Sequence, residues 1–252
     1  MRVSIDPDPE AMGARAARLA AEGLRRALAA RGRATLVLAT APSQATLHAA
    51  LARSGPDWPS IEIFHLDEYI GLGAGHPASF AGLLQRGFLP RLPAPPKAFH
   101  AVDGQADPGA ECRRLAALLA TRPVDVACIG IGENGHVAFN DPPADFRTAE
   151  AYIPVSLDLA CRRQQTGEGW FPTVEDVPPR ALSMTVRQIL SAARVVCAVP
   201  DARKARAVRD AVEGPLGPDC PASALRAHPD CHLCLDAAAA GMLSPLFSMH
   251  LA

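Results

Sequence analysis

The feature that most constrains the fold is a series of short apolar segments that alternate with amphipathic segments along the 252-residue chain. Most of these segments are apolar from end to end, which is typical of strands whose two faces are both covered by helices. Their β-branched content and their short length favour strands over helices. The predicted strands are 34–40, 61–69, 124–132, 181–184, 194–200 and 231–236.

The amphipathic segments between these strands predict helices. In residues 9–31 the apolar side chains recur at i, i+3, i+4 and i+7, arginines lie on the other face, and Pro9 and Gly32 stand at the two ends. Ser43 and Asp201 are candidates for capping two further helices. The other predicted helices are 42–55, 76–92, 107–122, 185–193 and 201–214.

The alternation of strand and helix predicts an α/β fold with a doubly wound, largely parallel sheet and helices on both faces, of the Rossmann-like kind. We expect a single domain over residues 1–252, because no repeat or linker interrupts the pattern. The stretches 87–108 and 214–223, which are rich in proline and glycine, are interpreted as loops within that domain. A chain of this length buries enough apolar surface to fold without disulfides.

Composition excludes several classes of function. The formal net charge of −1 gives no electrostatic reason to bind nucleic acid or an anionic membrane. No run approaches the roughly 18 apolar residues of a membrane span, and the charged N-terminal segment is unlike a signal peptide. Seven cysteines, an odd number, indicate reduced thiols and a cytoplasmic protein. The "CHLC" at 231–234 is a lone pair inside a predicted strand, so we expect no metal site.

Polar residues follow four of the predicted strands. In a doubly wound sheet ligands bind at the carboxyl ends of the strands, so these four segments are expected to face one cleft. They are "TAPSQ" (40–44), "LDEY" (66–69), "GENGH" (132–136) and "PDARK" (200–204).

Asp67 and Glu68 are adjacent residues of a strand, so their side chains should point in opposite directions and at most one should face the cleft. A carboxylate in that position can act as a general base, because burial raises its pKa. The alternative is that both acids are solvated in a loop.

His136 follows two glycines, which allow a tight turn and the close approach of a ligand to the backbone. Asp141 could accept a hydrogen bond from one ring nitrogen and leave the other free for a substrate. This arrangement is that of an oriented acid/base. A structural histidine is the alternative.

The start of the helix after Thr40 is a candidate anion site, because helix N-termini present free N–H groups and a positive dipole end. Ser43 adds a hydroxyl group. Lys204 lies in the first turn of another helix, where a cation opposes the dipole, and an anionic ligand would explain its presence. The alternative for Lys204 is a solvated surface lysine.

Two of these motifs resemble a known family. The segments "FHLDEYIGLGAGHPASF" (64–80) and "GIGENGHVAFNDPP" (130–143) are similar to the deaminase branch of the glucosamine-6-phosphate deaminase and 6-phosphogluconolactonase superfamily. The lactonase branch has "DER" where this chain has "DEY", and lacks the acid that follows the Gly-His pair. The similarity extends to 200–214 and 221–230, and so over nearly the whole chain.

The resemblance implies an enzyme that opens the ring of glucosamine 6-phosphate, isomerises it and releases ammonia, leaving fructose 6-phosphate. Such an enzyme needs no metal or organic cofactor. Asp67 matches the base that moves a proton between C1 and C2, His136 matches the ring-opening acid/base, and Asp141 matches the acid that orients the histidine. Lys204 matches a phosphate-binding lysine.

The resemblance also gives a set of further contacts with the substrate. The loop after the first long strand matches a phosphate cradle, and neighbours of the two catalytic residues are expected to help to bind the sugar. The residues concerned are Thr40, Ala41, Ser43, Gln44, Glu68 and Gly135.

Several positions depart from the family pattern. Asn134 replaces an aspartate, and a neutral amide can position the histidine ring without stabilising its cation. Asp141 replaces a longer glutamate. Ala41 and Pro42 replace two glycines in the cradle, and Pro42 removes one backbone donor. The family's phosphate-clamping arginine has no clear counterpart, and the candidates for its place are Arg162, Arg163 and Gln165.

These departures leave alternatives to the glucosamine-6-phosphate deaminase. One is a related enzyme for another sugar phosphate, such as galactosamine 6-phosphate, or for the hydrolysis of 6-phosphogluconolactone. Another is a non-catalytic sugar-phosphate sensor, which Asn134 and Pro42 favour and which the retention of Asp67 and His136 disfavours. The expected partner is a small sugar phosphate, and a homo-oligomer is allowed because family members range from monomers to hexamers.

Overall fold

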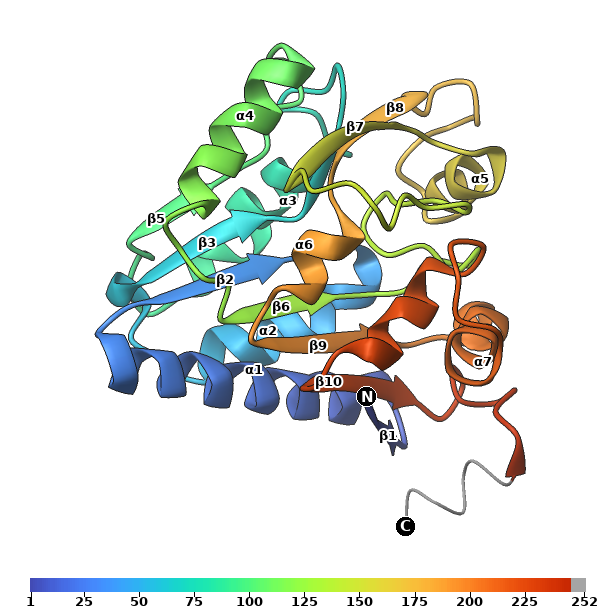
Figure 1. The fold of residues 1–252 in the computed structure, drawn as a ribbon, viewed down its shortest axis with the longest axis horizontal. Helices are drawn as coiled ribbons and strands as arrows, with labels where there is room; N and C mark the ends of the chain where they lie inside the picture. Colours follow the sequence, from blue (N-terminus) through green and yellow to red (C-terminus); the bar gives the residue numbers. More distant parts are fainter. Residues whose placement is uncertain (246–252) are drawn as a thin grey trace.

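The computed structural model describes residues 1–245, and its centre is a seven-stranded parallel sheet (Figure 1). The strand order is β1-β10-β9-β6-β2-β3-β5, and every neighbouring pair is parallel. The predicted α/β fold with a largely parallel sheet is confirmed. The strands are β1 (Arg2–Asp6), β2 (Ala34–Leu38), β3 (Ile61–His65), β5 (Ala98–His100), β6 (Val126–Ile129), β9 (Arg194–Val199) and β10 (Cys231–Asp236).

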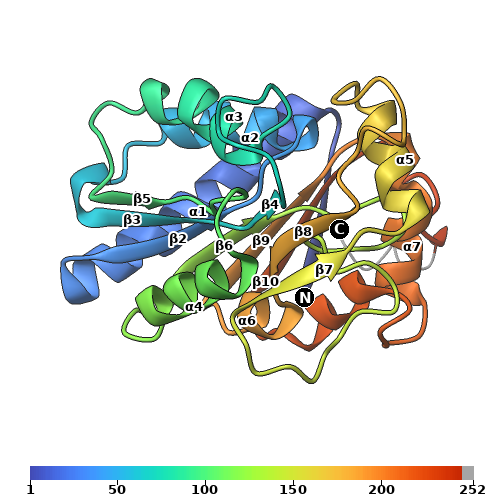
Figure 2. The same ribbon diagram turned by 90° about the horizontal axis from the view of Figure 1, so that it is seen from above.

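Helices cover both faces of this sheet, as Figure 2 shows from above. One core contains Leu24, Leu47 and Leu84, so α1, α2 and α3 share a face. The other core contains Leu115 and Val208 from the opposite face. Burying one such side chain contributes about 1.5–3 kcal/mol. The helices are α1 (Pro9–Arg31), α2 (Ala45–Arg53), α3 (Phe80–Gly87), α4 (Pro108–Leu119), α6 (Val186–Leu190) and α7 (Ala205–Glu213).

The prediction for α1 is confirmed residue for residue. The side chain of Asp8 caps its first turn by accepting a hydrogen bond from the N–H of Ala11 at 2.8 Å. At the other end Gly32 adopts a left-handed φ of 66°, and its N–H donates to the carbonyl of Leu28. A proline at the start and a left-handed glycine just past the end are the signals from which both boundaries were predicted.

A second, smaller sheet was not predicted, and it changes two of the predicted strands. It is antiparallel and has the order β4 (Asp67–Tyr69), β8 (Arg180–Met184) and β7 (Tyr152–Ser156). The single strand expected over 61–69 is therefore wrong. The chain leaves the main sheet at Leu66, whose N–H donates to Leu38 and whose carbonyl accepts from Met184. This change of sheet carries Asp67 beyond the carboxyl edge of the main sheet.

Several helix boundaries also differ from those predicted. The helix expected over 76–92 is only α3 followed by a separate 3-10 turn, because Ser79 caps a new start by accepting from the N–H of Gly82. Ser43 does not cap a helix; it lies inside the 3-10 turn Pro42–Gln44 that precedes α2. Asp201 is a cap as expected, since it accepts from the N–H of Arg203.

The carboxyl ends of the main strands point toward the side of the molecule where α5 (Leu159–Gly167) and α7 lie (Figure 1). Helix α5 was not predicted, because its sequence is largely polar. No helix within residues 1–245 has the length and apolar character needed to cross a membrane.

Candidate active site

The carboxyl ends of β2, β6 and β9 meet the start of β4 around a narrow cavity of 60 Å³. A larger cavity of 370 Å³ adjoins it and shares Ser43 and Lys204 with it. The narrow cavity alone is small for a sugar phosphate, whereas the two together fall in the usual range for a small-molecule site. Of the residues named from the sequence, those that line the narrow cavity are Thr40, Ala41, Ser43, Gln44, Asp67, His136, Gln165 and Lys204.

Asp67 is the first residue of β4 and is only 5% exposed, yet its carboxylate makes no hydrogen bond or ion pair with any residue from 1 to 245. Burial, reinforced by the nearby charge of Glu68, raises the pKa of Asp67 well above its ordinary value. A buried carboxyl group without a protein partner, beside a cavity, has the properties of a general base.

Glu68 points away from the cavity, as the alternation of strand side chains requires. Its carboxylate accepts hydrogen bonds from the N–H groups of Tyr69, Phe80 and Ala81 and from the hydroxyl of Ser79. Glu68 was expected to bind substrate. The structure instead places it under the start of α3, where it fixes the backbone that follows Asp67.

His136 stands at the end of a tight turn after β6. The N–H of Gly132 donates to the carbonyl of His136 at 2.9 Å, and Gly135 adopts a φ of 86° that favours glycine. The His136 ring lies directly over Gly132: a Cβ atom added there would be 2.1–2.4 Å from three ring atoms. Gly135 therefore shapes the turn and lies outside the lining of the narrow cavity.

Asp141 and Asn134 lie behind His136. Nδ1 of His136 is 3.1 Å from Oδ1 of Asp141, although the angle is not that of a hydrogen bond. The amide of Asn134 donates to Asp141 and to Asp158, and its oxygen accepts from the N–H of His136. Burial alone would raise the pKa of Asp141, but the adjacent His136 ring and the Asn134 amide hold it below its ordinary value. Asp141 is thus a carboxylate placed to orient the ring.

The loop between β2 and α2 forms one wall of the narrow cavity. Gln44 is buried and donates to the carbonyl of Ala198, while its Oε1 has no hydrogen-bond partner among residues 1–245. The hydroxyl of Thr40 is also buried without a partner in this part of the chain. Since unpaired buried polar groups are costly, these two atoms indicate that a polar ligand completes the wall.

Lys204 ends the turn before α7 and is 3% exposed. Burial lowers the pKa of Lys204 from its ordinary value, against the opposing effect of Glu168. Its Nζ is 4.0 Å from Oε1 of Glu168, a residue that the sequence analysis did not associate with the site. The alternative that Lys204 is a solvated surface lysine is therefore wrong.

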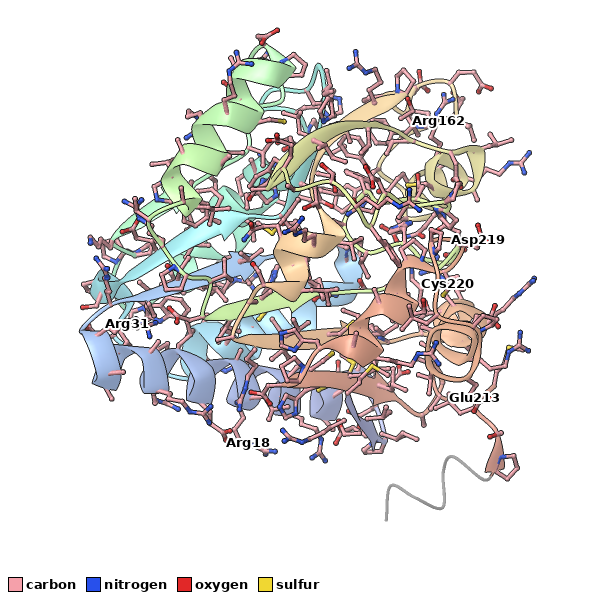
Figure 3. All side chains as sticks on the ribbon, viewed as in Figure 1. Arg18, Arg31, Arg162, Glu213, Asp219 and Cys220 are labelled. Atoms are coloured by element: carbon pink, nitrogen blue, oxygen red, sulfur yellow. The ribbon has the colours of Figure 1, made fainter. Side chains whose placement is uncertain are left out.

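The three candidates for a phosphate-clamping residue lie on α5 but do not all reach the site. Arg162, labelled in Figure 3, donates to the carbonyl of Val174, and Arg163 is exposed. Gln165 lines the narrow cavity, where its side chain accepts from the hydroxyl of Tyr69. Neither arginine lines the narrow cavity or its larger neighbour.

Among the residues around the two cavities that were not predicted from the sequence are two aromatic and two polar residues of the narrow and larger cavities. Phe80 and Phe139 stack with ring centroids 5.6 Å apart and an interplanar angle of 10°, and both line the narrow cavity. Gln164 lines the same cavity and Glu168 lines the larger one. The only available signal for the last two was the run of polar residues in α5, which was not recognised as a helix.

The segment that follows α5 carries two aromatic residues, Trp170 and Phe171, and neither is exposed. Phe171 is 5% exposed and packs edge-on against Tyr69 with ring centroids 5.4 Å apart. Trp170 is partly buried beside the cradle loop. Both aromatic side chains of this segment therefore pack against the rest of the protein instead of extending into solvent.

Within residues 1–245 one cluster has the composition of a metal site: His136, Asp141 and Cys161 have potential ligand atoms within 4.8 Å of one another. Burial raises the pKa of the Cys161 thiol well above its ordinary value, which disfavours the thiolate form that metals bind. Cys231 and Cys234 belong to cores on opposite faces of the main sheet and cannot share an ion.

The fold and the site together define a class of protein, a Rossmann-like α/β enzyme with acid/base residues at the carboxyl ends of its strands. The sequence profile described as "Glucosamine-6-phosphate isomerases/6-phosphogluconolactonase" matches residues 7–233. The chain belongs to this family.

Similar proteins agree with this assignment. A glucosamine-6-phosphate deaminase of Listeria monocytogenes is 34% identical over 213 residues, which cover 83% of this chain and 87% of that protein. One of Lactobacillus delbrueckii subsp. bulgaricus is 36% identical over 215 residues, which cover 84% and 88%.

Among solved structures, a monomeric glucosamine-6-phosphate deaminase superposes with a TM-score of 0.87 at 31% identity, over 96% of this chain and all of that one. A 6-phosphogluconolactonase described as putative, from Neisseria gonorrhoeae, has a TM-score of 0.72 at 21% identity, over 94% of this chain and 99% of that one, and shares the fold.

Proposed function

We propose that the protein is an isomerising deaminase that converts glucosamine 6-phosphate to fructose 6-phosphate and ammonia by acid/base catalysis. The observation that carries the proposal is Asp67: a buried carboxylate with no partner among the described residues, lining the same cavity as His136. Relatives at about 35% identity that bear this name support the choice of reaction.

The first step assigned to this site is ring opening. His136 moves the proton of the C1 hydroxyl to the ring oxygen, which breaks the C1–O5 bond and leaves an aldehyde. Asp141, 3.1 Å from Nδ1, fixes the ring so that the other nitrogen is available to the sugar.

The second step is a proton shift. Asp67 removes the proton from C2, which lies α to the carbonyl, and returns a proton to C1 through an enolamine. A raised pKa suits this role, because the group must both accept and release a proton near neutral pH. The product is an imine at C2, which water hydrolyses to the ketone with release of ammonia.

The test is ammonia release from purified protein with glucosamine 6-phosphate, with galactosamine 6-phosphate in parallel. We expect release with the first sugar and its loss in Asp67→Asn, which keeps the size of the side chain and removes the base. Equal release by the variant would overturn the role of Asp67. No release from either sugar, with binding retained, would point to the sensor. A cytoplasmic location stays a prediction from the sequence, which leaves the oligomeric state open.

A further inference from the structure

The end of the site that holds Lys204 has no net positive charge. Besides Lys204, the other cation that lines the larger cavity is Arg203. Its guanidinium lies 2.9 Å from Asp201 and 3.6 Å from Glu133, while Lys204 lies 4.0 Å from Glu168. Each cation at this end therefore already faces at least one carboxylate of the protein.

Glu168 is a fixed part of this end. Its side chain is 5% exposed, and its Oε1 accepts a hydrogen bond from Nε2 of Gln164 at 2.9 Å. Gln164 is held in turn by the N–H of Glu133, which donates to Oε1 of Gln164 at 2.9 Å. The carboxylate is thus positioned by a chain of two hydrogen bonds that begins at the loop carrying His136.

The pair of Lys204 and Glu168 is incompletely satisfied. Oε2 of Glu168 is buried without a donor, and Nζ of Lys204 makes no hydrogen bond to any residue from 1 to 245. One side chain lacks a donor and the other lacks an acceptor. A hydroxyl group can supply both, since it donates one hydrogen bond and accepts others. A phosphate dianion can only accept, and its charge is repelled by Glu168.

We propose that Glu168 is a specificity-determining residue that adapts this end of the site to a group with a proton to donate, and that it disfavours a phosphate dianion. Two sources of such a group are the C6 hydroxyl of an unphosphorylated amino sugar and the P–OH of a singly protonated phosphate ester. The inference rests on the proposed function for the orientation of the sugar, with its reacting carbons at Asp67 and its far end at Lys204.

The test measures equilibrium binding in the Asp67→Asn protein, which leaves the ligand unconverted, so its outcome does not depend on ammonia release. The ligands are glucosamine and glucosamine 6-phosphate at pH 8, where the phosphate is a dianion. We expect Glu168→Gln to tighten binding of the phosphate at least tenfold and to weaken or leave unchanged that of glucosamine. Glu175→Gln is the matched control, because it makes the same change at an exposed side chain that lines neither cavity, and it should change the binding of neither ligand.

Repeating both titrations at about pH 5.5 distinguishes the two sources, because the phosphate ester there is largely singly protonated. If the P–OH is bound, the wild-type carboxylate should favour the phosphate at pH 5.5 and lose that preference at pH 8. If the hydroxyl is bound, glucosamine should equal or exceed the phosphate at both values. The other titratable groups facing this end are Lys204, Arg203, Glu133, Asp201 and Asp236, so the Glu168→Gln comparison is made separately at each pH.

A uniform effect of Glu168→Gln on both ligands at both pH values would overturn the proposal. Should this variant fail to fold, Lys204→Met and the double variant Lys204→Met/Glu168→Gln answer the same question, since the double variant removes both charges of the pair. We expect the double variant to bind glucosamine 6-phosphate more tightly than Lys204→Met does. Equal or weaker binding would contradict the repulsion by Glu168.

Discussion

Gly132 offers a direct test of whether the position of the His136 ring matters for the reaction. The ring lies so close to this glycine that a Cβ atom would sit 2.1, 2.3 and 2.4 Å from Cε1, Nε2 and Nδ1. Ordinary van der Waals contacts begin at 3.4 Å. In Gly132→Ala the imidazole must therefore move by about 1 Å, and a displacement of that size typically costs about 10²-fold in rate.

The assay is kcat for ammonia release from glucosamine 6-phosphate, together with a thermal melt. Overpacking a well-ordered region costs about 1–3 kcal/mol, so the variant should fold with a lowered Tm. Gly75→Ala is the matched control, because Gly75 has no atom within 4 Å of the added Cβ and no left-handed φ. A folded Gly132→Ala protein with wild-type kcat would refute the argument that this ring position is needed.

Three further predictions follow from individual contacts. Because the pKa of Asp67 is raised in the folded protein, this carboxyl group ionises at a lower pH in the unfolded chain, and the wild type loses stability as pH rises above about 4. In thermal melts the Tm of Asp67→Asn should equal that of the wild type near that pH and exceed it at pH 8. Glu68→Gln should lose about 1–3 kcal/mol in urea unfolding, because the amide nitrogen replaces one carboxylate oxygen and cannot accept the two hydrogen bonds of that oxygen; an unchanged midpoint would contradict this. Asp141→Asn should lower kcat about tenfold or more with a small change in Tm, since it removes the charge 3.1 Å from Nδ1 of His136; an equal loss of Tm and kcat would indicate a structural role only.

The central strands and the first helix could be predicted because their signals are local. Residues 9–31 carry their apolar period, their N-terminal proline and their C-terminal glycine within one segment, and the structure gives the helix the same bounds. The strand at 231–236 is likewise largely buried on both faces, which its mostly apolar sequence indicates. The edge strands β1 and β5 were missed, since a strand with one neighbour carries polar residues and is short.

The second sheet depends on pairings that no local pattern contains. Asp67 pairs with Ser183, more than a hundred residues away, and β8 pairs on its other side with β7, whose Pro154 weakens the strand signal. The sequence therefore placed Asp67 at a strand end correctly but on the wrong sheet.

The same limit applies to the candidate site. From the strand ends and glycine turns in the sequence, Asp67, His136 and Lys204 could be assigned to one site, because parallel strands end at a common edge of the sheet. The structure places all three in the lining of one cavity. The carboxylate of Glu168 could not be assigned to the adjoining larger cavity, because Glu168 directly follows a polar helix whose burial arises only from the tertiary fold.

The most direct test of the central claim, that Asp67 moves a proton between C1 and C2, is hydrogen exchange in the reverse direction. Fructose 6-phosphate and ammonium are incubated with the protein in deuterium oxide, and NMR follows the protons at C1 of the ketose. The account predicts loss of one C1 proton signal with the wild type and none with Asp67→Asn, although both proteins bind the sugar. Exchange at the wild-type rate in the variant would contradict the account.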